Sequence, residues 1–400
     1  MKILTISAQK PNSTGSGVYL MELVKSFCKK GFQNVIVCGI DKDDILKEEE
    51  GIIYEPVYFQ TEDLPFPVVG MSDLMPYKST RYRDLTPDMQ KQFEDKFINK
   101  IKSVEKKFHP DLILCHHLYF LTALVREYFP DQKIAAICHN TDLRQFKNIE
   151  MQNDRIQKNI QSLDLIFSLH DKQKDEIASL FKIDKKKIRT IGAGYNNRVF
   201  QNKKLERPKD KVHIVYAGKL SDQKGVPCLL SALNKICVDK KIKLSLAGGY
   251  SDENEYRKIK KAAEESRYEI EFLGKLSQKE LAEVFNQSHI FVLPSFSEGL
   301  PLVVVEALAC GLKVIVTDLP GIKDWMDDHI KDHNISFVKL SRKDKNALLS
   351  VEEIEQFTDN LSKEIEKAIM QYKTYQMPDV SGVSWDSVAD QILKSERKRR

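Results

Sequence analysis

Strand–helix alternation, repeated in two halves of the chain, is the feature that most restricts its fold. In the first half, short apolar runs are separated by longer amphipathic segments, of which Val18–Lys30 is a predicted helix that ends at Gly31. Such alternation implies a parallel sheet covered by helices on both faces. The predicted strands of this half are Lys2–Ser7, Asn34–Ile40, Leu112–Cys115, Ile134–Cys138, Leu165–Ser168 and Ile188–Ile191.

The second half repeats the pattern and predicts a second doubly wound sheet. Its predicted strands are Val212–Ala217, Lys243–Ala247, Glu269–Phe272, His289–Pro294 and Lys313–Thr317. Its predicted helices include Val226–Lys235, Glu255–Ser266, Gln278–Asn286 and Pro301–Cys310. Ligands of open α/β sheets bind beyond the carboxyl ends of the strands, so the strand-to-helix loops are the places to search for chemistry.

A charged segment separates the two halves. Gln201–Lys211 has almost no apolar content and includes Pro208, which is typical of a domain boundary. The 400-residue length also exceeds what one hydrophobic core usually serves. We predict an α/β fold of two Rossmann-like, doubly wound parallel-sheet domains facing across a cleft. The first would comprise residues 1–200 completed by residues 383–400, with the last helix crossing back to it, and the second residues 201–382.

Composition excludes several classes of protein. The chain is 42% hydrophobic and 30% charged, which is ordinary for a globular protein. Its apolar runs fall short of the roughly 18 residues of a membrane span, and its N-terminus lacks the features of a signal peptide. Seven cysteines without a C-x-x-C pair indicate reduced thiols, and the adjacent Cys115, His116 and His117 have the wrong spacing for zinc. We therefore expect a cytoplasmic protein without a metal.

Charge gives weaker guidance about partners. The net charge is +5, and basic residues are not interleaved with aromatic ones, so nucleic acid is not an expected partner. The densest basic run, Lys394–Arg400, has two interpretations. It is either a solvated helix end or a surface that contacts an anionic acceptor or an anionic membrane. The second interpretation would allow a peripheral position at the inner membrane surface. Residues 60–95, rich in Pro, Asp, Tyr and Arg, suggest an excursion from the sheet that acts as a lid or acceptor loop.

The segment Pro294–Gly311 (PSFSEGLPLVVVEALACG) combines two glutamates with a helix start. Pro301 suits the first helical position, which places Glu298 in the preceding loop and Glu306 five residues into the helix. The free amides of the first turn and the helix dipole form an anion site suited to phosphate. Glu306 is either a solvated helix residue or, as its apolar neighbours favour, a buried one with a partner. Sugar and ribose hydroxyls would serve as such partners.

Three other strand-to-helix loops carry polar groups. Lys219 and Lys224 flank one loop, where two ammonium groups suit a diphosphate, although solvated lysines have the same appearance. Ser13–Gly17 (STGSG) allows close backbone approach to a phosphate or sugar, but a plain flexible loop fits equally well. The absence of G-x-G-x-x-G there disfavours an NAD-dependent oxidoreductase. His139 follows a predicted strand and is either a ligand-facing group or a structural histidine beside an Asx turn.

The spacing of Glu298 and Glu306 is that of the E-x7-E motif of retaining glycosyltransferases of the GT-B fold. The surrounding PSFSEGLPLVVVEALACGLKVIVTDLPG closely resembles glycosyltransferase family four, also called glycosyl transferases group 1. AGKLSDQKGV, EIEFLGKLSQKELAEVF and the late SWDSVADQI are similar to the same family. The chain departs from it at Lys219, where the family often has arginine, and in the first loop, where its paired glycines are only partly matched.

The resemblance implies a role for each loop. Glu306 would hold the nucleotide ribose, Glu298 the hydroxyls of the donor sugar, and His139 would lie beside that sugar. Lys219 and Lys224 would neutralise the diphosphate. Asp142 would orient a substrate. The remaining implied contacts are close backbone approaches and main-chain contacts at Gly15, Gly17, Gly218, Leu273, Gly274, Gly299, Leu300, Pro301, Leu302 and Val303.

By the same resemblance, the chain would be a retaining hexosyltransferase that needs neither metal nor cofactor. Its donor would be a nucleotide-sugar, with UDP favoured because it is common in such families, and His139, Lys219, Lys224 and Glu298 would be catalytic. The acceptor would be a saccharide, a lipid-linked compound or a small molecule with a hydroxyl group. The alternatives are a non-catalytic GT-B binding subunit that partners an active transferase, and a GT-B nucleotide-sugar epimerase or hydrolase.

Overall fold

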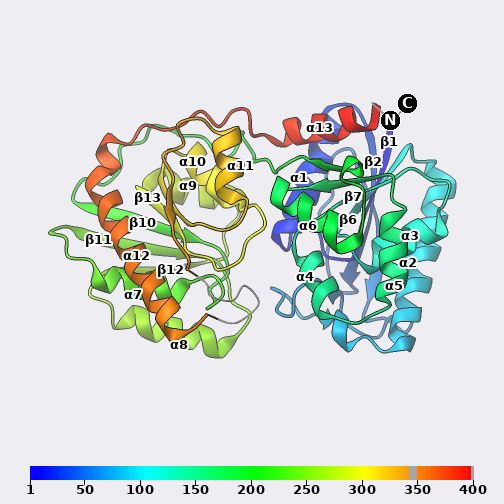
Figure 1. The fold of residues 1–400 in the computed structure, drawn as a ribbon, viewed down its shortest axis with the longest axis horizontal. Coiled ribbons are helices and arrows are strands. Elements are labelled where there is room, and N and C mark those ends of the chain that lie inside the picture. Colours follow the sequence, from blue (N-terminus) through cyan, green and yellow to red (C-terminus); the bar gives the residue numbers. More distant parts are fainter. Residues whose placement is uncertain (342–348, 398–400) are drawn as a thin grey trace. The chain divides into compact units, whose positions relative to one another are not determined.

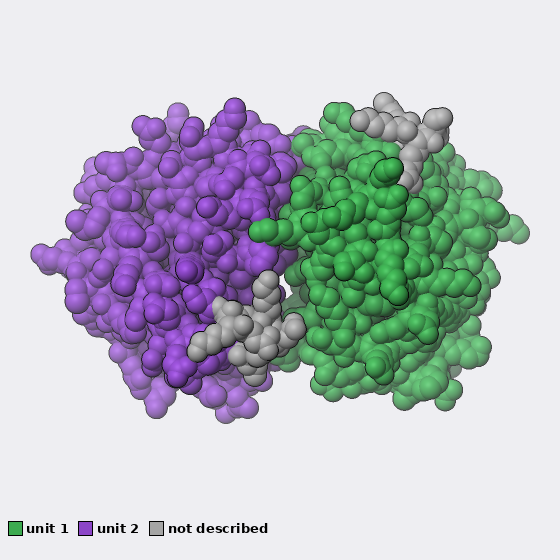
Figure 2. Space-filling model, viewed as in Figure 1, with its two compact units in different colours: residues 1–193, 385–400 green, residues 194–384 purple. Residues whose placement is uncertain are grey.

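The computed structural model describes residues 1–341 and 349–397 of the chain, which form two compact units (Figures 1 and 2). Unit 1 consists of Met1–Ala193 together with Trp385–Arg400, and unit 2 of Gly194–Ser384. The last helix, α13 (Trp385–Arg397), packs against α1 (Gly15–Lys29) of unit 1. The prediction that the final helix returns to the first domain is therefore confirmed.

Unit 1 is built on a seven-stranded sheet in the order β3-β2-β1-β6-β7-β8-β9, with every neighbouring pair parallel. The central strands are almost completely buried, which explains why they were recognisable as short apolar runs. The order reverses between β1 and β6, and this switch point is where open α/β sheets bind ligands. The strands are β1 (Lys2–Ser7), β2 (Gln33–Asp41), β3 (Ile52–Phe59), β6 (Leu112–His116), β7 (Ile134–Ile137), β8 (Leu165–Ser168) and β9 (Ile188–Thr190).

Helices connect these strands and flank the sheet (Figure 1). Besides α1 and α13 they are α2 (Pro87–Phe108), α3 (Phe120–Tyr128), α4 (Thr141–Asn148), α5 (Asn153–Gln161) and α6 (Asp171–Phe181), with a short 3-10 turn η2 at Lys185–Lys187. The ends of α2 follow familiar rules. The Thr86 hydroxyl accepts a hydrogen bond from Met89 N at its start, Pro87 occupies the first turn, and His109 adopts the left-handed conformation at its end.

The segment of residues 60–95 forms its own small structure beside the main sheet. It contains the two-stranded pair β4 (Val69–Gly70) and β5 (Thr80–Arg81), the 3-10 turn η1 (Tyr82–Asp84) and the start of α2. Its apolar side chains are buried in the core of unit 1, namely Leu64, Phe66, Val68, Val69, Met71, Tyr82 and Phe93. The segment is thus packed on unit 1 at its apolar positions, and its role as a lid or acceptor loop stays a prediction.

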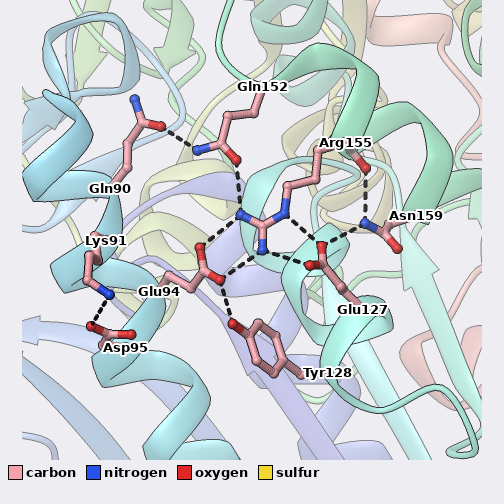
Figure 3. A network of polar contacts seen from close by, with 9 residues as sticks. All are labelled: Gln90, Lys91, Glu94, Asp95, Glu127, Tyr128, Gln152, Arg155 and Asn159. Carbon is pink, nitrogen blue, oxygen red and sulfur yellow. Dashed lines mark hydrogen bonds and ion pairs between the residues drawn. The ribbon is translucent and has the colours of Figure 1, made fainter.

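A polar clamp on unit 1 joins three helices around Arg155 of α5 (Figure 3). Its guanidinium donates to both carboxylate oxygens of Glu94 on α2, at 2.9 and 2.8 Å. It also donates to both oxygens of Glu127 on α3, at 2.7 and 2.9 Å. Tyr128 OH donates to Glu94 as well, at 2.8 Å. Fork geometry of this kind is specific to arginine and fixes the relative positions of the helices.

Unit 2 holds a six-stranded sheet in the order β12-β11-β10-β13-β14-β15, again parallel throughout, with its switch point between β10 and β13. The strands are β10 (Lys211–Ala217), β11 (Lys241–Ala247), β12 (Glu269–Gly274), β13 (Ile290–Leu293), β14 (Lys313–Thr317) and β15 (Ser336–Val338). The helices are α7 (Val226–Lys235), α8 (Glu253–Glu264), α9 (Gln278–Gln287), α10 (Leu302–Ala309), α11 (Ile322–His329) and α12 (Val351–Gln371), with the turn η3 at Tyr372–Thr374. The predicted α/β fold with two doubly wound parallel sheets is confirmed.

Three helix starts differ from the prediction, and α8 begins at Glu253, two residues before the predicted start. Helix α1 begins at Gly15, inside the segment taken as a loop, because the Thr14 hydroxyl caps it by accepting Gly17 N at 3.2 Å. Helix α10 begins at Leu302, since Pro301 has an extended backbone (ψ 103°) and is the N-cap residue rather than the first helical one. Within the part of the chain that the structure describes, no helix combines the length and apolarity needed to cross a membrane. The end of the basic run Lys394–Arg400, from residue 398 on, lies outside the described residues.

Candidate active site

Backbone hydrogen bonds join the carboxyl ends of three neighbouring strands of unit 2, namely β10, β11 and β12. After β10, Gly218 N donates to Ala247 O at 2.9 Å and Leu220 N to Gly249 O at 2.9 Å. After β11, Gly248 N donates to Gly274 O, the last residue of β12, at 2.7 Å. These bonds fix the loop that carries the two predicted lysines against its neighbours.

Two glycines show how closely these loops approach. A Cβ atom on Gly248, whose φ is +147°, would lie 1.7 Å from Gly218 O. A Cβ atom on Gly225, the residue before α7 with φ +67°, would lie 2.1 Å from Pro294 O, at the end of β13. Only glycine fits either position. The second contact, with Phe296 N donating to Gln223 O at 3.0 Å, brings together the loops on both sides of the switch point.

Lys224 and Glu298, which belong to these two loops, form an ion pair. The distance from Lys224 Nζ to Glu298 Oε1 is 2.6 Å, and the side chains are 27% and 15% exposed. Both groups therefore remain partly accessible from solvent while they position one another. The sequence assigned them to different parts of a donor, the diphosphate and the sugar. The structure brings them together at the point where the sheet order reverses.

Glu306 lies on the second turn of α10 and is only 8% exposed. Its neighbours in the sequence, Val305 and Ala307, are buried as well. The first turn of α10 has no side-chain cap because Pro301 offers no acceptor. The helix thus presents amides that are not capped by a side chain, followed by a buried carboxylate. The anion site and the hydroxyl acceptor expected at this point stay predictions.

The other predicted donor-side residues of unit 2 line the same edge. Lys219 lies at a turn held by Tyr216, whose buried hydroxyl donates to Lys219 O at 2.6 Å. The same hydroxyl would lie 2.7 Å from a Cβ atom added to Gly218. Leu273 and Gly274 end β12, in a strand rather than in the loop expected from sequence. Gly299, Leu300 and Pro301 lie between β13 and α10, with Leu302 and Val303 in the first turn.

In unit 1, strained backbone marks the carboxyl edge of three adjacent strands. Asn12 after β1, His117 after β6 and Asn140 after β7 have φ values of 58°, 74° and 73°. Non-glycine residues rarely adopt this conformation; seven others do so elsewhere among the described residues, several of them at helix ends such as His109. The three strands are neighbours in the sheet, and the switch point lies between the first two. We therefore regard this edge as the candidate site of unit 1.

His139 lies at this edge and is partly exposed. Its Nε2 is 3.0 Å from Nδ1 of His116, the last residue of β6, and the two rings stack with centroids 5.2 Å apart. The ring of His117 lies 4.8 Å away and that of Tyr19 5.1 Å away. The predicted ligand-facing histidine is thus held by three aromatic neighbours.

Asp142 does not match its implied role. It is completely buried, and its carboxylate accepts from Leu118 N at 2.8 Å, His139 N at 3.1 Å and Cys138 Sγ at 3.3 Å. These bonds satisfy the carboxylate within the protein and fix the loop on which His139 lies. Asp142 therefore has a structural role in this loop rather than a contact with a substrate.

Gly15 and Gly17 also differ from expectation, because both belong to the first turn of α1. The Gly17 amide is already used by the Thr14 cap. A Cβ atom on Gly17 would lie 3.0 Å from both Asn12 N and Lys10 O, whereas one on Gly15 would have no neighbour within 4 Å. Gly17 thus permits the loop after β1 to pack closely against the helix. At position 15, by contrast, no neighbouring atom requires a glycine.

Sequence reasoning missed the residues that surround His139. His116 and His117 were weighed only as zinc ligands, and Tyr19 was not considered. In the described ranges, no three His, Cys, Asp or Glu side chains are grouped to hold a metal ion. A signal was available, because His116 ends a buried strand and His117 follows it, much as His139 comes just after its own strand. What was missing was the knowledge that the two strands are neighbours.

Comparison with known proteins agrees with this geometry. The model of the family described as Glycosyl transferases group 1 matches residues 197–370, and that of Glycosyltransferase Family 4 matches residues 13–198. These matches cover both edges described above. Each model matches slightly less than half of the chain, and together with the fold they support a group 1 glycosyltransferase of the GT-B fold. The predicted family is supported at this level.

Individual relatives of this glycosyltransferase are distant. It is 23% identical over 334 residues to N-acetyl-alpha-D-glucosaminyl L-malate synthase from Bacillus anthracis, covering 78% of each chain. It is 26% identical to an uncharacterized glycosyltransferase, MJ1607, from Methanocaldococcus jannaschii, a match that spans 38% of this chain and 41% of that protein. Among solved structures, Anabaena Alr3699/HepE in complex with UDP and glucose aligns over 100% of both chains with a TM-score of 0.67 and 13% identity.

Proposed function

We propose that this glycosyltransferase moves a hexosyl group from a nucleotide-sugar, with UDP as the nucleotide, to a hydroxyl group of an acceptor with retention of anomeric configuration. The observation that carries the proposal is the edge of unit 2, where the Lys224–Glu298 pair adjoins the uncapped start of α10 and the buried Glu306. The complex of the structural neighbour HepE with UDP and glucose supports this choice of donor.

The parts of the site suit the parts of such a donor. The amides that open α10 and the ammonium groups of Lys219 and Lys224 complement a diphosphate. Glu306 accepts from the ribose hydroxyls, which are neutral donors and so compensate the burial of its charge. Glu298 accepts from hydroxyls of the sugar while Lys224 keeps its carboxylate oriented. Leu273 and Gly274 contact the base through the main chain.

In the reaction, the bond between the anomeric carbon and the diphosphate oxygen breaks, and positive charge develops on the sugar. Lys224, Lys219 and the start of α10 stabilise the negative charge that accumulates on the leaving diphosphate. The acceptor oxygen attacks the anomeric carbon from the same face, and its proton passes to a leaving phosphate oxygen. His139 donates to a hydroxyl of the sugar. The two glutamates are not an acid–base pair, because their partners are hydroxyl groups. The chain itself supplies all of these groups, so the reaction requires no metal.

Calorimetric titration with UDP, GDP and ADP, with EDTA and then with magnesium, tests the donor assignment. We expect one nucleotide to bind equally well under both conditions, and Glu306→Gln to weaken it at least about tenfold, the loss of one charged hydrogen bond. Glu283→Gln, an exposed glutamate on α9, is the matched control. Absence of binding by any nucleotide would favour a non-catalytic partner subunit, and binding that requires magnesium would contradict metal independence.

Turnover with the matching nucleotide-sugar separates the remaining alternatives. Transfer should depend on an added acceptor, and the anomeric proton coupling in the product should equal that of the donor. Release of free sugar without any acceptor, or formation of an epimer of the donor, would instead identify a hydrolase or an epimerase. An inverted product would refute retention.

A further inference from the structure

Three histidines meet at the carboxyl ends of β6 and β7 in unit 1. His116 and His117 are only 4% and 5% exposed, whereas His139 is partly exposed. Since His116 Nδ1 lies 3.0 Å from His139 Nε2, the two rings share one hydrogen bond and one proton. His139 thus reaches the surface while a buried histidine holds it from behind.

The three rings are neutral at physiological pH. Burial lowers the pKa of His116 to about 3 and also lowers the pKa of His117. Burial, together with repulsion from the other two histidines, brings the pKa of His139 well below its ordinary value. Among the described residues, Asp142 is a charged group that faces the cluster: its Oδ2 lies 3.9 Å from His117 Nδ1 and raises the pKa of His117 in part. Tyr19, the other neighbour, stays protonated because burial raises its pKa.

The environment of His116 indicates which nitrogen carries the shared proton. Its second ring nitrogen, Nε2, is buried and has no hydrogen-bond partner among the described residues. A neutral imidazole has one donor and one acceptor nitrogen. A buried N–H donor without a partner is rarer in proteins than an unused acceptor, and the cluster already contains one at His117, whose two ring nitrogens both lack a partner among the described residues. The favoured arrangement places the proton on His116 Nδ1, which donates to His139 Nε2. His139 must then carry its own proton on Nδ1.

We propose that His116 is a positioning residue that fixes His139 as a neutral N–H donor through Nδ1, which is available to a hydroxyl group of the sugar. The part of this inference that concerns the sugar rests on the proposed function, whereas the tautomer is a property of the free protein. A donor held in one tautomer and one ring plane reaches the reacting complex already oriented.

The packing around the rings supports a positioning role. The ring of Tyr19 lies edge-on to His139 at 5.1 Å, and its hydroxyl donates to Gly192 O at 2.9 Å. Trp385, at the start of α13, lies edge-on to Tyr19 at 4.7 Å. His139 thus contacts both His116 and a tyrosine that is itself packed against the returning C-terminal helix.

Nitrogen-15 NMR of the histidine side chains in the free protein tests the tautomer without any substrate. We expect His139, assigned by comparison with His139→Asn, to carry its proton on Nδ1 and to show no titration between about pH 5 and 8. His116→Phe keeps a ring but removes the donor, so His139 should shift toward the Nε2–H tautomer. His116→Asn places an amide where Nδ1 was and should preserve the wild-type signal. His109→Asn, an exposed histidine after α2, is the control.

Transfer kinetics test the consequence. We expect His116→Phe to lower kcat about 10–100-fold, as loss of a residue that orients a functional histidine typically does, with His116→Asn retaining most of the activity. A proton on Nε2 of wild-type His139, or an unchanged His139 spectrum in His116→Phe, would overturn the assignment. Expected spectra with unchanged kcat would overturn the role in the reaction. A chain that transfers no sugar would refute the proposed function and leave the spectroscopic test of the tautomer intact.

Discussion

Replacing Arg155 by methionine should destabilise unit 1 without changing its fold. Methionine keeps the helix propensity and much of the apolar stem of arginine but removes the guanidinium that joins α2, α3 and α5 (Figure 3). Glu94 and Glu127 would then lose four charged hydrogen bonds, all between 2.7 and 2.9 Å, and would face each other without a shared cation.

The size of the effect follows from exposure as well as geometry. Hydrogen bonds to charged groups contribute about 1.5–3 kcal/mol each when buried, but exposed ion pairs contribute at most about 1 kcal/mol. The side chains of Arg155, Glu94 and Glu127 are 29%, 15% and 38% exposed, so solvent screens much of the interaction. We expect a total loss of about 1–3 kcal/mol, between the two limits. For a unit of this size that corresponds to a fall in Tm of about 2–10 °C.

Differential scanning calorimetry and hydrogen exchange measured on the full chain would test this estimate. Lys91→Ala provides the control, because Lys91 pairs with Asp95 on the exposed face of α2 in the same region, at 3.5 Å with side chains 76% and 55% exposed. That variant should lose less than about 0.5 kcal/mol. If Arg155→Met and Lys91→Ala had equal effects, the argument that bidentate geometry and partial burial make the clamp effective would be refuted.

The same clamp predicts a dependence on pH. The hydrogen bonds from Arg155 hold the pKa of Glu94 below its ordinary value of 4.5. A carboxyl whose pKa is depressed in the folded state contributes stability above its unfolded pKa and loses that contribution as the pH falls through the folded value. The difference in stability between wild type and Arg155→Met should therefore be constant above about pH 5 and shrink below pH 4.5. A difference that grew on acidification would contradict the assignment.

Three further predictions concern the candidate sites. Gly248→Ala should cost at least about 2 kcal/mol because its Cβ would overlap Gly218 O, whereas Gly15→Ala, with open space around it, should be neutral or stabilising; equal thermal shifts would contradict this. Lys224→Ala should lower kcat about 10²–10³-fold in transfer assays by removing charge from the leaving diphosphate, and an effect below about threefold would exclude that role. Thr14→Ala should destabilise α1 by about 1 kcal/mol in denaturant titrations through loss of its cap, with no change meaning that the cap is unimportant.

Several helix and strand bounds could be predicted, because they depend on residues that are close together in the sequence. Strands β1, β8 and β14 and helix α7 have the bounds that apolar runs and turn residues predicted. The start of α1 was placed too late, because Gly15 and Gly17 are poor helix formers and the Thr14 cap that outweighs them was overlooked. The start of α10 was placed one residue early, because a proline near a helix start satisfies the rule at either position.

The sequence by itself determined the two-sheet architecture and indicated the family, because strand periodicity and motif spacing depend on neighbours along the chain, and it predicted the donor-side residues. Only the tertiary structure decided which of these residues meet. Lys224 and Glu298 are 74 residues apart, and His116 and His139 are 23 apart. Each pair forms because strand order places two carboxyl ends side by side, at a switch point in one unit and at β6 and β7 in the other. Strand order is set by the packing of helices and strands across the whole unit. The sequence of a single segment therefore gives little indication of which strands will be neighbours.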